Sequence, residues 1–128
     1  MSETYVLDAS AILTVINGER GFEIVLNLLS NASASAVNIS EVVSKLQERG
    51  GSDAAIDNIL AGFEINVVAF DFEQAMMAGK LRRQTRGKGL SFGDRACLAL
   101  AASRNSIAVT TDKAWENVEN VASIKLVR

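Results

Sequence analysis

Short apolar segments alternate along this chain with longer segments of helical periodicity, a pattern typical of a parallel β-sheet covered by crossover helices. We expect strands, each rich in Val, Ile or aromatic residues, at Tyr5–Leu7, Ser35–Val37, Ile65–Phe70, Ile107–Thr110 and Ile124–Val127. We expect helices at Ala9–Ile16, Glu23–Leu29, Glu41–Arg49, Ala54–Ala61, Phe72–Arg86 and Gly93–Arg104. The expected fold class is therefore α/β.

The length and hydrophobic content of the chain fit one domain. The chain has 128 residues, of which 48% are hydrophobic. A chain of this size buries roughly two-thirds of its unfolded surface, so it can form a substantial core. No linker, repeat or low-complexity tract divides it, and with no proline its helices are ended by glycine and polar caps. We expect a single domain over residues 1–128.

Two residue types that many active sites need are absent or nearly so. The chain has no histidine, which excludes Ser-His-Asp and Cys-His nucleophiles, histidine-ligated zinc and paired-imidazole RNA cleavage. Its single cysteine, Cys97, excludes an intrachain disulfide and a thiolate cluster, and we expect it to be a small buried side chain. The start of the chain, MSETYVLD, lacks signal-peptide features and no run reaches membrane-spanning length, so we expect a cytoplasmic protein without membrane association.

Charge is unevenly distributed although the total is nearly balanced. Thirteen basic and fifteen acidic residues give a net charge of −2, so the chain as a whole has no attraction for nucleic acid. The segment from Gln74 to Gly93 contains no acid and carries five basic residues: Lys80, Arg82, Arg83, Arg86 and Lys88. This segment is either a solvated helix face or a local binding patch.

Carboxylates follow the predicted strands. Asp8 comes directly after Tyr5–Leu7, and Asp112 follows Ile107–Thr110 after one residue. Glu41 and Asp94 are placed in the first turns of two predicted helices. Because the carboxyl ends of parallel strands and the N-termini of their crossover helices meet at one edge of the sheet, we expect all four acids at that edge.

Helix capping is an alternative explanation for each acid. Asp8 and Asp112 could cap the segments that follow them, Glu41 could complement a helix dipole, and Ser91 with Asp94 fits a capping box. Their convergence is harder to explain in this way. Two carboxylates about 4 Å apart repel by roughly 4 kcal/mol at an effective dielectric constant near 20, and a bound cation removes that cost.

The donor chemistry favours Mg²⁺ or Mn²⁺. Hard divalent ions take oxygen ligands from carboxylates and keep water for a phosphate substrate, whereas zinc prefers the imidazole and thiolate ligands that are missing here. Such ions activate water and neutralise phosphoryl oxygens, which indicates phosphodiester hydrolysis. The hydroxyl groups of Ser10, Thr110 and Thr111 could orient the carboxylates or could simply make turn hydrogen bonds.

Four segments together resemble those of VapC-type PIN-domain ribonucleases: VLDASAIL from Val6, SAVNISEVVSKL from Ser35, GLSFGDRACLALA from Gly89 and AVTTDKAW from Ala108. They span nearly the whole chain in the family's order. The resemblance implies a three-layer α/β/α sandwich with a mostly parallel five-stranded sheet. It also implies that Asp8, Glu41, Asp94 and Asp112 are the catalytic, metal-binding acids, with Ser10 as the accompanying hydroxyl.

The same resemblance implies an activity and partners. Members of this family cleave RNA with Mg²⁺ or Mn²⁺, form homodimers, and are usually the toxins of toxin–antitoxin pairs. The VapB-type antitoxin typically lays a C-terminal segment along a groove of the toxin and can place a basic side chain in the acidic site. Under this interpretation the basic residues between Lys80 and Lys88 contact the RNA backbone.

Three further residues could take part in the site or in the core. Trp115 could stack on a base but is expected to pack in the core, and Arg95 could form an ion pair beside Asp94. Glu116 could add a carboxylate near Asp112, but the predicted site consists of the four acids without it.

Two other classes of protein share features with this sequence. A phospho-receiver domain also places acids at strand ends, but it needs an acidic pair after the first strand, where this chain has only Asp8, and its lysine lies beyond the last strand, whereas Lys125 falls within it. Asp71 is better explained as an N-cap, with Gln74 completing a box-like arrangement. A non-catalytic binding module of the same fold is the other alternative, although all four acids are present.

Overall fold

The central feature of the fold is a parallel sheet of five strands, seen in the computed structural model, which describes residues 3–128. The strand order is β3-β2-β1-β4-β5, and each neighbouring pair is parallel. The strands are β1 (Tyr5–Leu7), β2 (Ala32–Ser35), β3 (Asn66–Val68), β4 (Ile107–Thr110) and β5 (Ile124–Leu126). The predicted fold class is confirmed.

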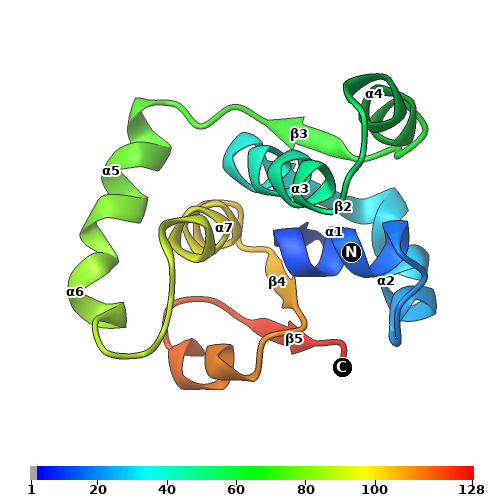
Figure 1. Ribbon diagram of the computed structural model, residues 1–128. Coiled ribbons are helices and arrows are strands. Elements are labelled where there is room, and N and C mark those ends of the chain that lie inside the picture. The colour runs from blue at the N-terminus through cyan, green and yellow to red at the C-terminus, as the bar shows by residue number, and fades with distance from the viewer. Residues whose placement is uncertain (1–2) are drawn as a thin grey trace.

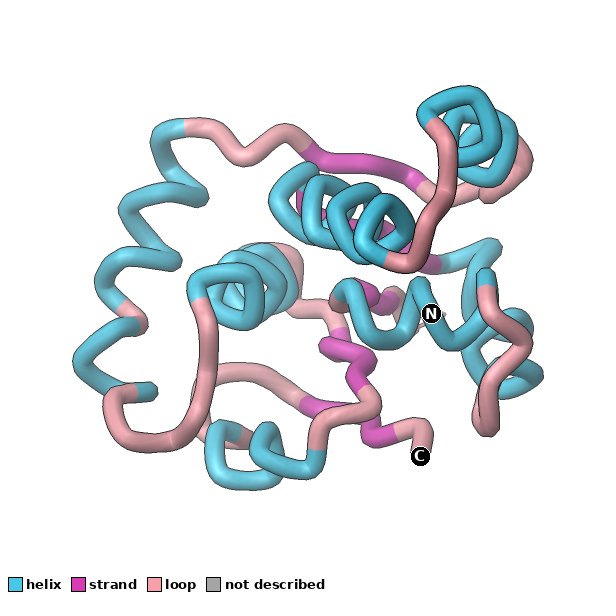
Figure 2. Tube along the Cα trace, in the orientation of Figure 1, coloured by secondary structure: helices cyan, strands magenta, loops and turns pink. Residues whose placement is uncertain are grey.

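Helices connect every pair of successive strands (Figures 1 and 2). The α-helices are α1 (Ala9–Ile16), α2 (Phe22–Leu28), α3 (Ala36–Glu48), α4 (Asp53–Ala61), α5 (Phe72–Lys80), α6 (Arg82–Thr85) and α7 (Phe92–Ser103). Two 3₁₀ segments, η1 (Leu29–Asn31) and η2 (Lys113–Val118), precede β2 and β5. None of the helices in residues 3–128 has the length and hydropathy needed to span a membrane.

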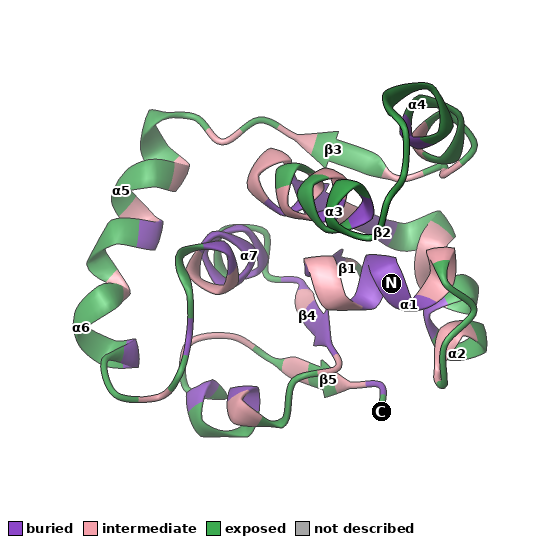
Figure 3. Ribbon diagram, in the orientation of Figure 1, coloured by how far each residue is buried: buried purple, intermediate pink, exposed green. Residues whose placement is uncertain are grey.

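The sheet separates two hydrophobic cores, which makes the fold three-layered. Leu7 of β1 and Val109 of β4 point into the core built with α1 to α4, whereas their neighbours Val6 and Ala108 point into the core built with α7 and η2. This alternation follows from the two-residue period of a strand. The purple segments of Figure 3 show that the buried residues gather on the central strands and on the faces of α1, α3 and α7 nearest to them.

The strand order reverses next to β1. From β1 the chain first builds outward through β2 to β3, and it then returns to place β4 on the other side of β1. In open α/β sheets the crevice beyond the carboxyl ends of the strands at such a reversal is the usual ligand site. Asp8, directly after β1, and Asp112, after β4, lie at this point.

The second predicted strand, Ser35–Val37, is wrong in position. The strand is Ala32–Ser35, and α3 already begins at Ala36, five residues before the expected start at Glu41. The Ser35 side chain ends the strand because it accepts a hydrogen bond from the Val37 amide at 3.2 Å and so caps the helix. The small, weakly β-forming residues of β2 are extended because they are buried between β1 and β3.

The long helix predicted at Phe72–Arg86 is also wrong, because it is two helices. The chain forms α5 to Lys80 and α6 from Arg82, with Leu81 between them. Leu81 packs against the core on the α7 side of the sheet, which is a tertiary contact that periodicity alone does not reveal. The strand predicted at Ile65–Phe70 is confirmed only over Asn66–Val68, at the edge of the sheet.

Candidate active site

Four carboxylates from four elements line one cavity at the carboxyl edge of the sheet. The cavity has a volume of about 210 Å³ and is lined by Asp8, Ala9, Ser10, Leu13, Glu41, Lys45, Asp94 and Asp112. The tertiary structure therefore brings together all four acids that the sequence singled out. Asp8 comes from the end of β1, Glu41 from α3, Asp94 from the first turn of α7, and Asp112 from the turn after β4.

Asp8 is the most constrained of the four. Its Oδ1 atom accepts hydrogen bonds from the Ser10 hydroxyl at 2.7 Å and from the Ala11 amide at 2.8 Å. Its Oδ2 atom accepts the Thr110 hydroxyl at 2.6 Å, which joins the end of β1 to the end of β4. Asp8 caps α1, as the alternative explanation proposed, and its carboxylate still lines the cavity.

Burial sets the charge state of Asp8. The carboxyl group is removed from water, and this raises its pKa from 3.8 to about 6, even though the three hydrogen bonds lower it. The negative charge of Asp94 adds to the rise. Asp8 is therefore held in an environment that disfavours its charge unless a positive group is nearby.

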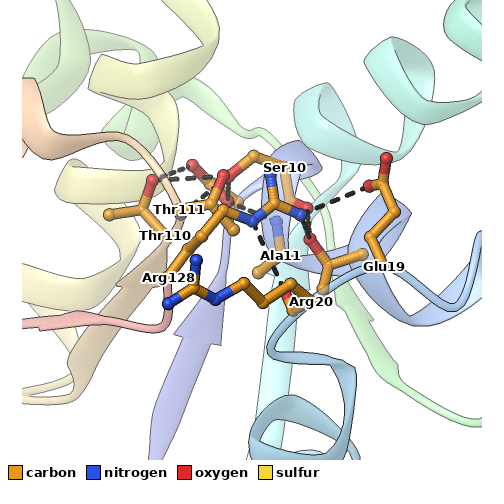
Figure 4. A network of polar contacts seen from close by, with 9 residues as sticks. Ser10, Ala11, Glu19, Arg20, Thr110, Thr111 and Arg128 are labelled. Carbon is orange, nitrogen blue, oxygen red and sulfur yellow. Dashed lines mark hydrogen bonds and ion pairs between the residues drawn. The ribbon is translucent and has the colours of Figure 1, made fainter.

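The hydroxyls of Ser10 and Thr110 and the amide of Thr111 form a small network behind Asp8 (Figure 4). The Thr111 amide donates to the Ser10 hydroxyl at 3.1 Å, so Thr111 contributes its backbone rather than the predicted side-chain hydroxyl. The Thr110 hydroxyl in turn accepts from the Asp112 amide at 3.1 Å. These bonds fix the positions of Asp8 and of the turn that carries Asp112.

Asp94 is held by the capping box that the sequence predicted. The Ser91 hydroxyl accepts from the Asp94 amide at 3.2 Å, and Asp94 Oδ2 accepts from the Ser91 amide at 2.9 Å. Desolvation is the main cause that raises the pKa of Asp94, and the charge of Asp112 raises it further. One oxygen of Asp94 thus serves the helix while the side chain still lines the cavity.

Glu41 reaches the cavity from the second turn of α3, not from its first turn as predicted. Burial is the main cause that raises its pKa, with a contribution from the charge of Asp94, while Asn38 and Lys45 lower it. A β-carbon on Gly93 would collide with the Glu41 carboxylate, so the missing side chain of Gly93 makes room for it. The dipole of α3 does not explain Glu41, because the dipole acts mainly within the first turn and Glu41 lies in the second.

Sequence reasoning missed two residues near the site. Asn38 is fully buried, and its amide donates to Glu41 Oε1 at 2.8 Å and to the Gly93 carbonyl at 3.0 Å. The signal was present, since an asparagine stands in the apolar stripe of α3, four residues before the buried Val42. Lys45, one turn beyond Glu41, lines the cavity, and its ammonium group lies 3.7 Å from Glu48.

A second polar cluster anchors the end of the chain to α1 (Figure 4). The Arg128 guanidinium donates to the Arg20 carbonyl and to the Thr14 hydroxyl, each at 3.3 Å, and lies 3.5 Å from the Glu19 carboxylate. Thr14 donates onward to the Ser10 carbonyl at 2.8 Å. These contacts support α1, the helix that Asp8 caps.

The predicted basic residues separate into two groups. Lys80, Arg82, Arg83 and Arg86, together with Gly79, line a cavity of about 790 Å³ along α5 and α6, which we call the basic groove. Among residues 3–128 none of these four cations forms an ion pair. Lys88 is not part of the groove, because its ammonium donates to the Asn117 carbonyl at 3.0 Å.

The remaining candidates have structural surroundings. Trp115 is fully buried, which confirms that it packs and excludes base stacking by its ring. Arg95 forms no ion pair within the described part of the chain, so that expectation is wrong: its guanidinium donates to the Ala78 carbonyl at 3.2 Å and lies 5.8 Å from the Phe92 ring centroid. Glu116 is exposed on η2 and does not line the cavity. Cys97 is buried, as expected.

The features that would mark a phospho-receiver are explained otherwise. Asp71 caps α5, where its carboxylate accepts the Gln74 amide at 2.9 Å, and Lys125 lies exposed within β5. The side chain of Gln74 does not complete a box, since it donates to the Ser103 hydroxyl at 3.0 Å.

The donor set of the cavity consists of oxygens. No histidine exists in the chain, and the buried Cys97 is not in the cavity wall. Within residues 3–128, no three Asp, Glu or Cys side chains converge closely enough to form a ready-made cage for one ion. A hard cation that keeps part of its water shell fits such a set, because water bridges the distances that the carboxylates do not span.

Residues 5–121 match the PIN domain family. Ribonuclease VapC42 of Mycobacterium tuberculosis and the VapC ribonuclease Mb2780c of Mycobacterium bovis are each 32% identical over 106 residues, which covers 75% of this chain and 81% of the relative. The chain therefore belongs to the PIN-domain family, and within it to the VapC ribonucleases.

Solved structures agree on the fold. VapBC2 from Rickettsia felis, determined with a DNA fragment from its promoter, matches with a TM-score of 0.78 at 17% identity, over 98% of this chain and 99% of the other. VapC20 of Mycobacterium tuberculosis, described as a toxin that cleaves the sarcin-ricin loop, matches with a TM-score of 0.73 at 15% identity, over 90% and 95% of the two chains. The three-layer architecture implied by the sequence resemblance is confirmed.

Proposed function

We propose that this chain, as a single PIN domain over residues 1–128, is an endoribonuclease that hydrolyses RNA phosphodiester bonds with a divalent cation. The observation that carries the proposal is the cavity in which Asp8, Glu41, Asp94 and Asp112 meet at the reversal of strand order. Membership of the VapC ribonucleases supports it. The absence of histidine removes the imidazole mechanism as a competitor.

The cation, Mg²⁺ or Mn²⁺, would be held by the four acids Asp8, Glu41, Asp94 and Asp112. The fit rests on an all-oxygen donor set and on the raised pKa values of Asp8, Glu41 and Asp94, whose burial and mutual charge a cation would offset. When bound, such an ion lowers the pKa of a coordinated water and neutralises charge on the phosphate.

The chain's own contribution is to fix the carboxylates in position. Ser10, Thr110 and the Ala11 amide occupy three lone-pair positions of Asp8, so the carboxylate keeps one orientation toward the cavity. The capping box does the same for Asp94. Preorganised ligands lose little freedom when a cation and a phosphate arrive, which favours the charged transition state.

The basic groove is proposed to bind the RNA backbone. Its four cations are not neutralised by ion pairs in the described residues, and Lys or Arg contacts to phosphate are independent of sequence. α5, which carries part of the groove, packs against α7, which carries Asp94. Lys88, predicted as a fifth contact, is a weaker candidate because it is bound to the Asn117 carbonyl.

A VapB-type antitoxin and a second copy of the chain are the proposed partners, and the chain is the proposed toxin of the pair. Structures of VapBC pairs from Rickettsia felis and Salmonella typhimurium support a protein partner for this fold. The proposed place of action is the cytoplasm. Co-purification with the product of a neighbouring antitoxin-like gene tests the first partner, and light scattering tests the second, where a monomer at high concentration would contradict the dimer.

The deciding experiment incubates the purified protein with labelled single-stranded and structured RNAs in Mg²⁺ or Mn²⁺. EDTA and the Asp8→Asn variant are the controls. Cleavage that requires the metal and disappears in the variant supports the nuclease. Metal binding without cleavage of any RNA contradicts it and favours a binding module, and cleavage that persists in Asp8→Asn contradicts the assignment of the site.

A further inference from the structure

Asn38 connects Glu41, one of the four acids of the site, to the first turn of the helix that carries Asp94. One hydrogen of Nδ2 goes to Glu41 Oε1 at 2.8 Å, on the same helix, and the other goes to the Gly93 carbonyl at 3.0 Å, on α7. Gly93 is the residue before Asp94. A single side chain therefore bonds both to one acid of the cavity and to the backbone beside another.

The chemistry of both neighbours requires the NH₂ group at this point. A carboxylate oxygen and a backbone carbonyl only accept hydrogen bonds, so only a side chain with two donor hydrogens satisfies them together. The Asn38 Oδ1 atom, in contrast, is buried and has no hydrogen-bond partner within residues 3–128. An oxygen left in that state lowers stability, so packing alone gives no reason for an amide here.

The surroundings of Asn38 also restrict Glu41. The Glu41 carboxylate lies in space that a β-carbon on Gly93 would fill, so α3 and α7 approach closely at this point. Asn38 itself is fully buried and cannot exchange these bonds for bonds to solvent. The Glu41 carboxylate is thus bonded to the Asn38 amide and lies against the backbone of Gly93.

We propose that Asn38 is a positioning residue that holds Glu41 against the first turn of α7, so that Glu41 and Asp94 act on the same cation. The inference rests on the proposed metal site. Asn38 touches neither substrate nor cation in this assignment and acts only through Glu41 and the Gly93 carbonyl.

The test measures Mn²⁺ affinity by calorimetry, independently of RNA cleavage, in Asn38→Ala and Asn38→Asp. Loss of a residue that orients a metal ligand typically weakens metal binding by about tenfold or more. We expect this loss of Mn²⁺ affinity in Asn38→Ala and a larger loss in Asn38→Asp. The aspartate keeps the shape of the side chain but places a carboxylate oxygen against the Glu41 carboxylate and the Gly93 carbonyl, which are both acceptors. A residue that only fills space gives the opposite order, and that order would overturn the proposal.

Ser106→Ala is the matched control. Ser106 is also buried and hydrogen-bonded, but it precedes β4 at the opposite edge of the sheet from Asp112, so its removal should leave Mn²⁺ affinity unchanged. Thermal unfolding of each variant shows whether it folds. If Asn38→Asp does not fold, Asn38→Ala combined with Glu41→Ala decides the question.

In the combined variant the two substitutions should not add, because Asn38 has nothing left to position once Glu41 is removed. An Asn38→Ala loss of the same size with and without Glu41 would contradict the proposal. Wild-type protein that binds no Mn²⁺ would refute the metal site itself, and the role of Asn38 with it. Normal Mn²⁺ binding by all Asn38 variants would refute the role of Asn38 alone and leave the proposed nuclease standing.

Discussion

The Glu41 carboxylate occupies the space that a side chain on Gly93 would need. The two residues belong to α3 and α7 and are far apart in sequence, so this contact exists only because two helices from opposite faces of the sheet meet at its carboxyl edge. The position of one proposed metal ligand thus depends on a glycine within a helix, where glycine is otherwise unfavourable.

Gly93→Ala should reduce activity without a comparable loss of stability. The added methyl group forces Glu41 out of place, and we expect at least a tenfold loss of RNA cleavage, of the order found when a ligand's support is removed, about 10- to 100-fold. Alanine in a helix gains roughly 1 kcal/mol over glycine, which offsets strain at the flexible end of Glu41. Cleavage rates and urea unfolding measure both effects. Gly62→Ala, at the end of α4 where a methyl group meets only ordinary contacts, is the control and should retain full activity.

Asp8→Asn should abolish cleavage and leave the protein folded. The substitution removes one charge from the proposed metal site, and we expect a fall in rate of at least about 100-fold, the upper end of the loss caused when only a ligand's supporting partner is removed. The near-identical shape and the relief of a buried charge keep the fold intact. Circular dichroism and metal-dependent cleavage test the two halves of this prediction, and full activity in the variant would contradict the role of Asp8.

The same residue makes stability depend on pH. Burial raises the pKa of Asp8 from 3.8 to about 6, so between these values the folded state binds more protons than the unfolded state. Stability therefore falls as pH rises through this window, by up to about 3 kcal/mol for a shift of roughly two units. Urea unfolding at pH 4.5 and 7.5 should show a smaller fall in Asp8→Asn than in wild type. Equal pH dependence in both proteins would show that Asp8 titrates normally.

Mg²⁺ or Mn²⁺ should raise the melting temperature, and more so at pH 7.5 than at pH 5. A ligand that binds only the folded state at about 100 times its Kd stabilises by roughly 2.7 kcal/mol. Below pH 6 the cation must displace a proton from Asp8, which weakens its binding. EDTA should reverse the shift. A shift that is independent of pH, or that persists in Asp8→Asn, would place the cation elsewhere.

Removal of charge from the basic groove should weaken RNA binding and reduce its salt dependence. Each lost phosphate contact lowers the log–log salt slope by about 0.7 for single-stranded RNA. We expect the combined variant Arg83→Ala with Arg86→Ala to show a slope reduced by up to about 1.4, twice that amount, in filter binding. Lys125→Ala removes an exposed charge on β5, outside the groove, and should leave the slope unchanged.

Gly21→Ala should destabilise the fold without touching the site. Gly21 has φ = 95°, and a β-carbon there would collide with the Val127 carbonyl. A non-glycine residue in the left-handed region costs about 1–3 kcal/mol, and the collision adds to this. Gly18 also has a positive φ, 63°, but has open space around it, so a substitution there causes backbone strain without a collision. Gly18→Ala should show only the smaller, conformational loss in urea unfolding.

Much of the site follows from local sequence. Asp8 and Asp112 stand after apolar strands, Asp94 stands in a capping box, and parallel strands with helical crossover connections put all such positions at one edge. These patterns depend on neighbouring residues and on the two-residue period of strands, so the chain alone carries them. The same holds for the five-strand α/β class and for the buried positions of Cys97 and Trp115.

Other features were decided by tertiary structure. β2 is extended because two neighbouring strands supply its hydrogen bonds, which its small residues do not predict. The helical pattern of residues 72–86 divides at Leu81, a residue that packs against a core. The contact of Asn38 with Gly93 spans 55 residues, and no local pattern specifies it. Composition and periodicity indicate which residues are buried and where helices and strands begin. The hydrogen-bond partner of a buried polar group depends instead on which helices pack against each other in the tertiary structure.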